Sequence, residues 1–219
     1  MRIVDILNEA SIFDERTLIN TDWEHPGRLA KWLKRNRFQE LGAGSFAAVY
    51  HRPGYNRIIK VSRRQDDCWI RFAKWSMQYT TNRHLPNIKW MKVYGGGEFF
   101  IALIEKLVPF TAAHIKHMDI ADIALLYAEE AFLEEDQSRE AVKRLIEEEV
   151  LDDDNIFSPE ALRITRAFAK EYATPFVQTY RAVERKLSKA PCVVDLHDQN
   201  LMFRPSDNSV VLIDPLAEL

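Results

Sequence analysis

Residues 192–214 read CVVDLHDQNLMFRPSDNSVVLID and form the part of the chain that decides its fold. Two apolar runs, Leu201–Phe203 and Val210–Ile213, are separated by Pro205–Asn208, whose residues favour a turn. This pattern predicts a β-hairpin, preceded by a short strand and a polar loop. A hairpin holds the ends of its two strands in register, so the residues just outside those ends should meet.

Three oxygen-bearing side chains lie just outside the open end of this hairpin. Asp195 and Asn200 precede its first strand, and Asp214 follows its second strand. Carboxylate and amide oxygens are the ligands that a magnesium–phosphate complex requires, because Mg²⁺ prefers oxygen and usually keeps substrate phosphates in its shell. Asp and Asn are also ordinary residues of solvated turns, so the cluster needs a second, independent motif.

A second motif lies upstream, in the glycine-containing stretch LGAGSFAAVY at residues 41–50. Gly42 and Gly44 remove side chains where a backbone approaches phosphate oxygens. The next apolar run, Ile58–Val61, contains a single lysine, Lys60. A lysine between β-branched residues is either a charge on an edge strand or a ligand for phosphate.

With both motifs in order, the chain resembles the protein-kinase-like superfamily. The glycine-rich loop G-x-G-x-x-G-x-V and the V-A-I-K lysine of that family are matched by Gly42, Gly44, Ala47, Val49 and Lys60, with Ala47 replacing the third glycine.

The catalytic motifs of the superfamily are matched further along the chain. Asp195 and Asn200 have the spacing of D-x-x-x-x-N, and Asp214 corresponds to the aspartate of D-F-G. Val193 and Val194 stand where the family has His and Arg. The resemblance covers about residues 37 to 215.

The resemblance implies an α+β, bilobal protein-kinase-like fold. It predicts a five-stranded antiparallel N-lobe sheet plus helix C, and a reduced, mainly helical C-lobe that lacks the activation segment and the later helices. The expected domains are an N-terminal helical extension (1–36), the N-lobe (37–105) and a minimal C-lobe (106–219).

The resemblance also implies ATP and Mg²⁺ as cofactors and assigns roles to single residues. Asp195 would orient the acceptor hydroxyl and take its proton, Lys60 would bind the ATP phosphates, and Asn200 and Asp214 would bind Mg²⁺. His197, a further catalytic candidate, would either contact the transferred phosphoryl group or brace the loop. The expected nucleotide-binding residues are Gly42, Ala43, Gly44, Ser45, Phe46, Ala47, Val49 and Lys60, with backbone atoms of Glu105 and Leu107 facing the adenine.

The region of helix C departs from the family. No acidic residue occurs from Cys68 to Gly97, so the glutamate that pairs with the family's lysine is missing. Either Asp67 replaces it or the pair is absent.

The expected function is transfer of the ATP γ-phosphoryl group to a protein serine or threonine, by a minimal kinase that resembles the early kinases of lytic coliphages, which modify host proteins. The loop tip Gly44-Ser45-Phe46, which resembles that of protein kinases, favours this acceptor, and two alternatives are kept. The first alternative is a small-molecule kinase of the aminoglycoside type, because Asp195-Leu196-His197 places histidine two positions after the aspartate. The second is a nucleotide-binding pseudokinase that acts as an interaction module.

Composition is that of a soluble, cytoplasmic enzyme. The 219 residues carry a net charge of −3, no membrane span or nucleic-acid partner is expected, and the oligomeric state cannot be read from the sequence. Cys68 and Cys192 lack metal-ligand spacing and are expected to be reduced packing residues of a cytosolic protein, with a disulfide as the alternative. Residues 129–154 contain twelve acidic and three basic residues, which indicates a solvated surface or a docking site for a basic protein substrate.

Overall fold

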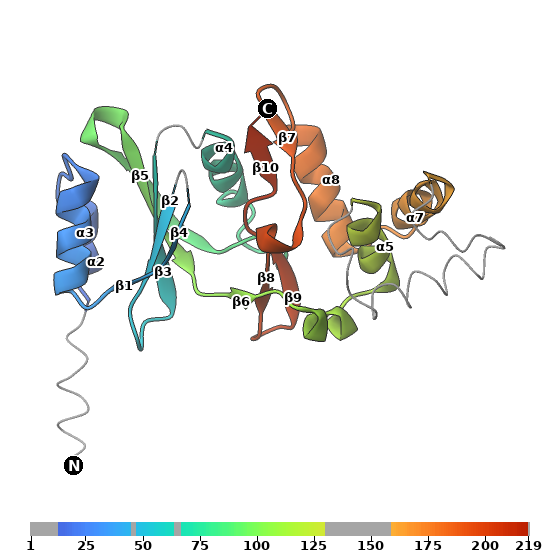
Figure 1. Ribbon diagram of the computed structural model, residues 1–219, viewed down its shortest axis with the longest axis horizontal. Coiled ribbons are helices and arrows are strands. Elements are labelled where there is room, and N and C mark those ends of the chain that lie inside the picture. The colour runs from blue at the N-terminus through green and yellow to red at the C-terminus, as the bar shows by residue number, and fades with distance from the viewer. Residues whose placement is uncertain (1–12, 45–46, 64–66, 130–158, 219) are drawn as a thin grey trace, which may run out of the picture. The chain divides into compact units, whose positions relative to one another are not determined.

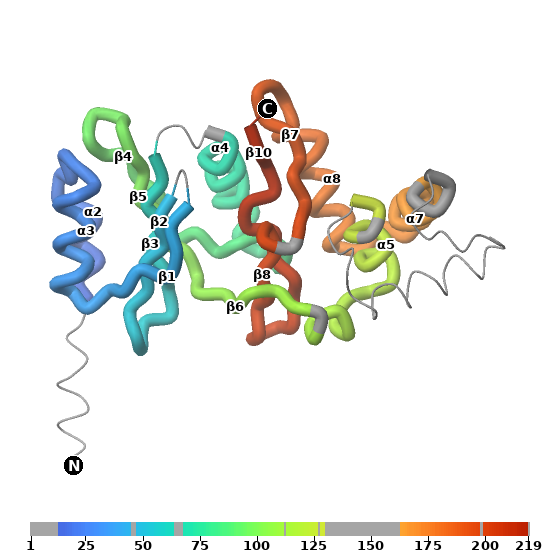
Figure 2. Tube along the Cα trace, viewed as in Figure 1, coloured from blue at the N-terminus to red at the C-terminus, as the bar shows by residue number. Residues whose placement is uncertain are grey.

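A computed structural model describes residues 13–44, 47–63, 67–129 and 159–218 (Figure 2). The chain divides into two compact units. The first comprises Met1–Asp67 and Asn87–Lys106, and the second comprises Cys68–Pro86 and Leu107–Leu219. The expected domain boundaries at residues 36/37 and 105/106 stay predictions.

The first unit is built on a five-stranded antiparallel sheet with the strand order β1-β2-β3-β5-β4 (Figure 1). This sheet confirms the predicted α+β fold class and the predicted N-lobe architecture. Its strands are β1 (Gln39–Ala43), β2 (Ala47–His51), β3 (Arg57–Arg63), β4 (Ile88–Tyr94) and β5 (Phe99–Glu105).

Glycines close the connection between β4 and β5. Gly95–Gly97 form a 3₁₀ turn, η1, in which all three residues have positive φ. Gly95 has φ +58°, and a Cβ atom there would lie 3.0 Å from the carbonyl oxygen of Glu24. The fold itself therefore requires glycine at position 95.

Two helices, α2 (Glu15–Asn20) and α3 (Pro26–Arg35), cover one face of this sheet (Figure 1). Asp14 caps α2 and His25 caps α3, since each side chain accepts a hydrogen bond from a backbone N–H in the first turn. Their apolar side chains pack against the strands in one core, which includes Leu18, Leu29, Leu33, Ile59, Phe99, Ile101 and Leu103.

The second unit is mainly helical. Its helices are α4 (Asp67–Ser76, whose first residue belongs to the first unit), η2 (Ala112–His117), α5 (Ile120–Ala128), α7 (Pro159–Glu171), α8 (Pro175–Leu187) and η3 (Asp198–Asn200). A proline inside a helical stretch predicts a kink or a break, and the structure has a break at Pro175: Thr174 caps α8 and Pro175 is its first residue. The strong helical propensity of residues 119–149 predicts a helix there as well, and apart from α5 most of that stretch lies outside the described residues.

The predicted hairpin is present in the second unit. β8 (Leu201–Arg204) pairs with β9 (Ser209–Leu212), and β6 (Val108–Pro109) adds a third strand beside β8. A separate two-stranded sheet joins β7 (Cys192–Val194) to β10 (Leu216–Glu218). The pairing of β10 with β7 was not predicted.

The expectation that both cysteines are reduced is wrong in this structure, which has a disulfide between Cys68 in α4 and Cys192 in β7. Their Cα atoms are 5.6 Å apart, within the range that a disulfide spans. Phe72 of α4 is fully buried in the second unit's core, and Arg71 Nη1 donates to the carbonyl oxygen of Lys189 at 2.9 Å. The disulfide therefore links α4 covalently to β7, the strand that precedes the loop at residues 195–200.

No helix among the described residues combines the length and the apolar character needed to cross a membrane.

Candidate active site

The loop between β7 and β8 is held by backbone hydrogen bonds on both sides of Asp214. The amide of Asp195 donates to the carbonyl of Pro215 at 3.0 Å, and the amide of Ile213 donates to the carbonyl of Asn200 at 3.0 Å. Asp214 therefore lies between two residues that are bonded to the loop. The structure brings Asp195, Asn200 and Asp214 to the same end of the hairpin, as the sequence predicted.

The side-chain amide of Asn200 has a defined orientation. Its Nδ2 donates to the backbone carbonyl of Asp195 at 2.8 Å and lies 2.8 Å from Nε2 of His197. The reverse orientation would place two oxygens 2.8 Å apart, which is unfavourable. Both amide hydrogens are thus directed at protein acceptors, and Oδ1 is the atom left to accept from or coordinate a ligand.

His197 braces this arrangement. Because an amide NH₂ only donates, Nε2 of His197 must accept and carries no hydrogen. The same nitrogen lies 3.4 Å from a carboxylate oxygen of Asp195, and the backbone amide of Asn200 donates to the carbonyl of His197 at 3.0 Å. The side chains of Asp195 and His197 are 43% and 40% exposed, so both are accessible to a substrate. A contact between His197 and a phosphoryl group stays a prediction.

The donor set at this end of the hairpin suits a metal that brings its own further ligands. Among the described residues, no group of three or more His, Cys, Asp or Glu side chains could hold a metal ion. An amide oxygen from Asn200 and a carboxylate from Asp214 are too few for a closed protein site. They fit Mg²⁺ bound to a nucleotide, since Mg²⁺ commonly takes one or two protein ligands and completes its shell with phosphates and water.

Lys60 lies in β3, the central strand of the first unit's sheet. It pairs with Val49 in β2 and with Ala102 in β5. The alternative that Lys60 is an edge-strand charge is therefore excluded. Lys60 is half-buried there, and its contact with ATP phosphates stays a prediction.

The glycine-rich loop connects β1 to β2. The amide of Gly44 donates to the carbonyl of Ala47 at 2.8 Å, and the β1–β2 register shifts between Glu40 and Gly42. A Cβ atom on Gly42 or Gly44 would meet nothing within 4 Å, and neither has a positive φ. The fold does not require glycine at these positions, in contrast to Gly95, so the open space suits a ligand that approaches the backbone. Ser45 and Phe46 lie outside the described residues.

The segment expected to face adenine is fixed at its start. Glu105 ends β5, and its amide donates to the carbonyl of Asn87 at 3.0 Å while its carboxylate accepts from the amide of Asn87 at 2.7 Å. The amide of Lys106 donates to the carbonyl of Asn56 at 3.0 Å, and Leu107 is buried. The adenine contacts of Glu105 and Leu107 stay predictions.

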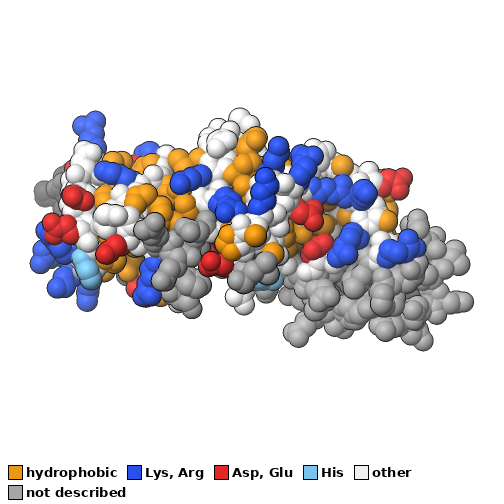
Figure 3. Space-filling view, turned by 90° about the horizontal axis from the view of Figure 1, so that it is seen from above, with side chains coloured by type: hydrophobic (Ala, Val, Ile, Leu, Met, Phe, Trp, Pro, Cys, Tyr) orange, Lys and Arg blue, Asp and Glu red, His pale blue; other side chains and the backbone are white. Residues whose placement is uncertain are grey.

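Two further expectations fall on residues whose placement is not described. The side chain of Asp67 is one of them, so its pairing with Lys60 stays a prediction. The other is the acidic run, of which only Glu129 is described. The exposed charged residues described in α7 and α8 are mostly basic: Arg163, Arg166, Lys170, Arg185 and Lys186, against Glu171 and Glu184. Figure 3 shows Lys and Arg side chains gathered over the right half of the face that it draws.

The sequence did not predict the disulfide between Cys68 and Cys192, although Cys192 lies only three residues before Asp195. Its only signal in the sequence is an even number of cysteines, which does not separate a disulfide from two thiols.

A scan against protein-family models and a search of curated proteins each found no match. Solved structures align along most of the chain with low scores. The aminoglycoside phosphotransferase APH(3'')-Id from Streptomyces rimosus aligns with a TM-score of 0.40 and 15% identity, over 88% of this chain and 77% of that chain. A streptomycin–ATP complex of APH(2")-IIa gives a TM-score of 0.36 and 16% identity, over 91% and 72%. The Cydia pomonella granulovirus kinase PK-1 gives a TM-score of 0.34 and 13% identity, over 89% and 59%.

These alignments are too weak to transfer a substrate or a site. The strand order of the sheet, the helix after β3 and the hairpin after the catalytic loop are nevertheless the arrangement expected of a protein-kinase-like fold. The fold is therefore protein-kinase-like, and the assignment of the site comes from this chain's own residues.

Proposed function

We propose that this protein is an ATP- and Mg²⁺-dependent phosphotransferase that moves the γ-phosphoryl group to a hydroxyl. The supporting observation is the loop in which Asp195, His197 and Asn200 contact one another while Oδ1 of Asn200 stays available. In an ordinary solvated turn, water can satisfy the hydrogens of a side-chain amide. Here both hydrogens of the Asn200 amide face acceptors in the protein, and its oxygen is the atom available to a ligand. Asp214, held beside the loop by its neighbours, supplies the charge that a metal site requires.

Each residue acts mainly by positioning and by charge. The backbone from Gly42 to Ala47 covers the ATP phosphates, and Lys60 binds the α and β oxygens. Asn200 and Asp214 would hold Mg²⁺, and the ion would supply positive charge beside the phosphates. Asp195 accepts a hydrogen bond from the acceptor hydroxyl, orients its oxygen toward the γ-phosphorus and takes the proton late in the transfer, while the bond from the γ-phosphorus to the bridging oxygen breaks and ADP leaves.

For the acceptor we favour a small molecule over a protein serine or threonine. The reason is His197, which occupies the position that resembles small-molecule phosphotransferases and contacts both Asp195 and Asn200. The loop-tip residues Ser45 and Phe46, which favoured a protein kinase in the sequence, lie outside the described residues. A protein acceptor remains the second candidate on the strength of the glycine-rich loop.

Two substitutions test the roles at the catalytic loop. Asp195→Asn should bind ATP normally and lose most phosphoryl transfer, because the carboxylate touches the acceptor and not the nucleotide. Asp214→Asn should raise the Mg²⁺ concentration needed for ATP binding as well as lower turnover, because a metal-ligand charge is lost. Normal turnover in Asp195→Asn, or unchanged Mg²⁺ dependence in Asp214→Asn, would contradict the assignment.

The acceptor is tested with γ-labelled ATP and a cytosolic extract, followed by separation of labelled proteins from labelled small molecules. Label in small molecules alone supports the first candidate, and labelled protein supports the second. Nucleotide binding without any Mg²⁺-dependent turnover would identify an interaction module and overturn the proposed activity.

A further inference from the structure

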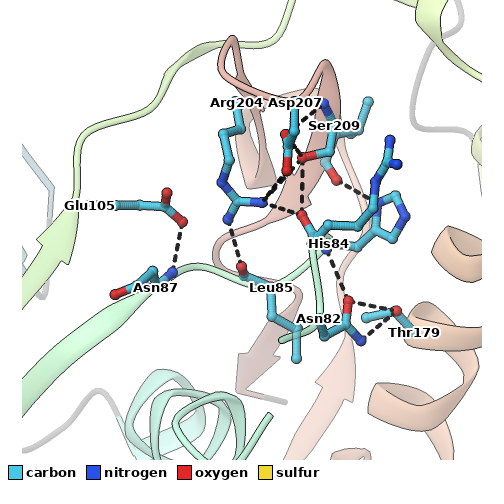
Figure 4. A network of polar contacts seen from close by, with 11 residues as sticks. Asn82, His84, Leu85, Asn87, Glu105, Thr179, Arg204, Asp207 and Ser209 are labelled. Carbon is cyan, nitrogen blue, oxygen red and sulfur yellow. Dashed lines mark hydrogen bonds and ion pairs between the residues drawn. The ribbon is translucent and has the colours of Figure 1, made fainter. Parts of the chain in front are cut away.

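A second polar network lies at the turn end of the β8–β9 hairpin, opposite the end that carries the catalytic loop (Figure 4). Arg204, the last residue of β8, directs its guanidinium at the segment that follows α4. Nη2 donates to the carbonyl of Leu85 at 2.9 Å, and Nη1 donates to the carbonyl of Arg83. Nη1 also donates to Oγ of Ser209 at 3.1 Å, so one side chain joins both hairpin strands to this segment.

The network is partly buried and its acceptors are shared. The side chain of Arg204 is 13% exposed, and the residue Ser209 is 1% exposed. Oγ of Ser209 lies 3.1 Å from the carbonyl of Arg83 and 2.6 Å from a carboxylate oxygen of Asp207, which itself pairs with Arg204 at 3.6 Å. Removing the guanidinium would take away the donor that the carbonyl of Leu85 has in the structure, and would leave the carbonyl of Arg83 with the hydroxyl of Ser209 alone.

His84 extends the connection along β9. Its Nδ1 donates to the carbonyl of Val210 at 2.9 Å, and its backbone carbonyl accepts from the amide of Leu212 at 3.0 Å. A carbonyl only accepts, so Nδ1 carries the hydrogen. The segment from Arg83 to Leu85 therefore lines β9 up to the residue before Ile213.

The far end of the same hairpin carries Asn200 and Asp214. Asn200 immediately precedes β8, and Ile213, which donates to the carbonyl of Asn200, immediately follows β9. Each strand has four residues, so Arg204 lies only about 13 Å along β8 from Asn200, one of the two candidate metal ligands. β8 and β9 are joined by only one further strand, the two-residue β6, and this sheet is small, so attachments at the turn end help to hold the register of the hairpin.

We propose that Arg204 is a positioning residue for the metal-binding pair: by tying the hairpin to residues 83–85, it fixes the separation of Asn200 and Asp214. This inference rests on the proposed function for its consequence in turnover. The inference also has a structural part, which needs no activity: the contacts of Arg204 at the turn end stabilise the bond between Ile213 and Asn200 at the open end of the hairpin. Arginine is suited to the role because its planar fork reaches acceptors on two sides, which the point charge of lysine does not.

The test compares wild type with Arg204→Met and Arg204→Lys, and uses Arg28→Lys as the matched control. Arg28 pairs with Glu24 at 2.9 Å on an exposed helix surface, with both side chains at least 66% exposed. Three quantities are measured well below the unfolding temperature: the Mg²⁺ concentration at half-maximal turnover, ATP affinity without Mg²⁺, and hydrogen exchange at the amide of Ile213. Ser209→Ala serves as a milder lesion of the same network if Arg204→Met fails to fold.

In Arg204→Met we expect the half-saturating Mg²⁺ concentration to rise about tenfold or more, with ATP affinity in the absence of Mg²⁺ nearly unchanged. Exchange at Ile213 should accelerate by about tenfold, because its bond to Asn200 opens more often. Arg204→Lys should fall between, and Arg28→Lys should match wild type. A lowered melting temperature with unchanged Mg²⁺ dependence and unchanged exchange at Ile213 would overturn the inference.

The outcomes also separate the inference from the proposed function. If wild type and Arg28→Lys both lack Mg²⁺-dependent turnover, the proposed function fails. The exchange rate at Ile213 still decides the structural part in that case: acceleration in the Arg204 variants supports it, and no change refutes it.

Discussion

Removing the Cys68–Cys192 disulfide should lower the stability of the protein by a large and calculable amount. The two cysteines are 124 residues apart in the sequence. In the chain-entropy model, a loop of this length removes about 16.5 cal/mol/K from the unfolded ensemble, or about 4.9 kcal/mol at 25 °C. That value is comparable to the whole unfolding free energy of a marginally stable domain.

The assay is urea unfolding of wild type and of the double variant Cys68→Ala/Cys192→Ala, each with and without a dithiol reductant. We expect that reducing the disulfide of unfolded wild type lowers its free energy of unfolding to about that of the double variant. The double variant itself should not respond to the reductant, which controls for nonspecific effects.

A thiol count provides the direct check. Cys68 and Cys192 are 4% and 1% exposed, so reagents reach them only after unfolding. Unreduced, unfolded protein should show no reactive thiol and reduced protein should show two. Two thiols in unreduced protein, or equal stability of all four samples, would refute the disulfide and restore the prediction of reduced cysteines.

Three other outcomes are expected. Burial raises the pKa of Asp122 from 3.8 to about 6 although Thr174 donates a hydrogen bond to it, so the folded state holds this proton more tightly than the unfolded state. Stability should therefore fall by up to about 3 kcal/mol as the pH rises from 4 to 6, and Asp122→Asn should abolish that dependence in unfolding curves. If Asp67 replaces the missing glutamate, Asp67→Ala and Lys60→Ala should lower turnover similarly and the double variant little further, whereas additive losses would exclude the pair. Gly44→Ala should leave the melting temperature unchanged or slightly higher but weaken ATP binding, because its Cβ atom has room in the protein and not beside phosphate.

Local patterns in the sequence were sufficient for the hairpin, whereas the five-stranded sheet was expected from the family resemblance. Apolar runs mark β8 and β9, and Pro205–Asn208 marks the turn between them. The exposed strand β1, Gln39–Ala43, carries no such apolar run. Whether Lys60 lies in an edge strand or in a central strand depends on the strand order of the sheet. The residues next to Lys60 in the sequence do not determine that order. The structure was needed to exclude the edge-strand alternative.

Contacts between distant segments could not be predicted. The pairing of β10 with β7 and of β6 with β8 joins short strands whose residues carry no periodicity. Helix α4 was assigned to the sheet by resemblance, yet its disulfide and the buried Phe72 place nearly all of it in the second unit. The contacts of Arg204 could not be predicted either, because its guanidinium donates to backbone carbonyls. Every residue has a backbone carbonyl, so the sequence does not show which residues Arg204 contacts.

The metal-binding pair shows why the candidate site was only partly predictable. Asn200 is oriented locally: His197, three residues earlier, accepts from its backbone amide through a carbonyl and lies beside its side-chain amide through Nε2. Asp214 is placed by the register of the hairpin, which the turn at Pro205–Asn208 determines. Spacing was enough to predict that both residues lie together, since a hairpin brings them together whatever the conformation of the loop. The orientation of the Asn200 side chain follows from its contacts with the carbonyl of Asp195 and with Nε2 of His197, and sequence spacing does not contain that geometry.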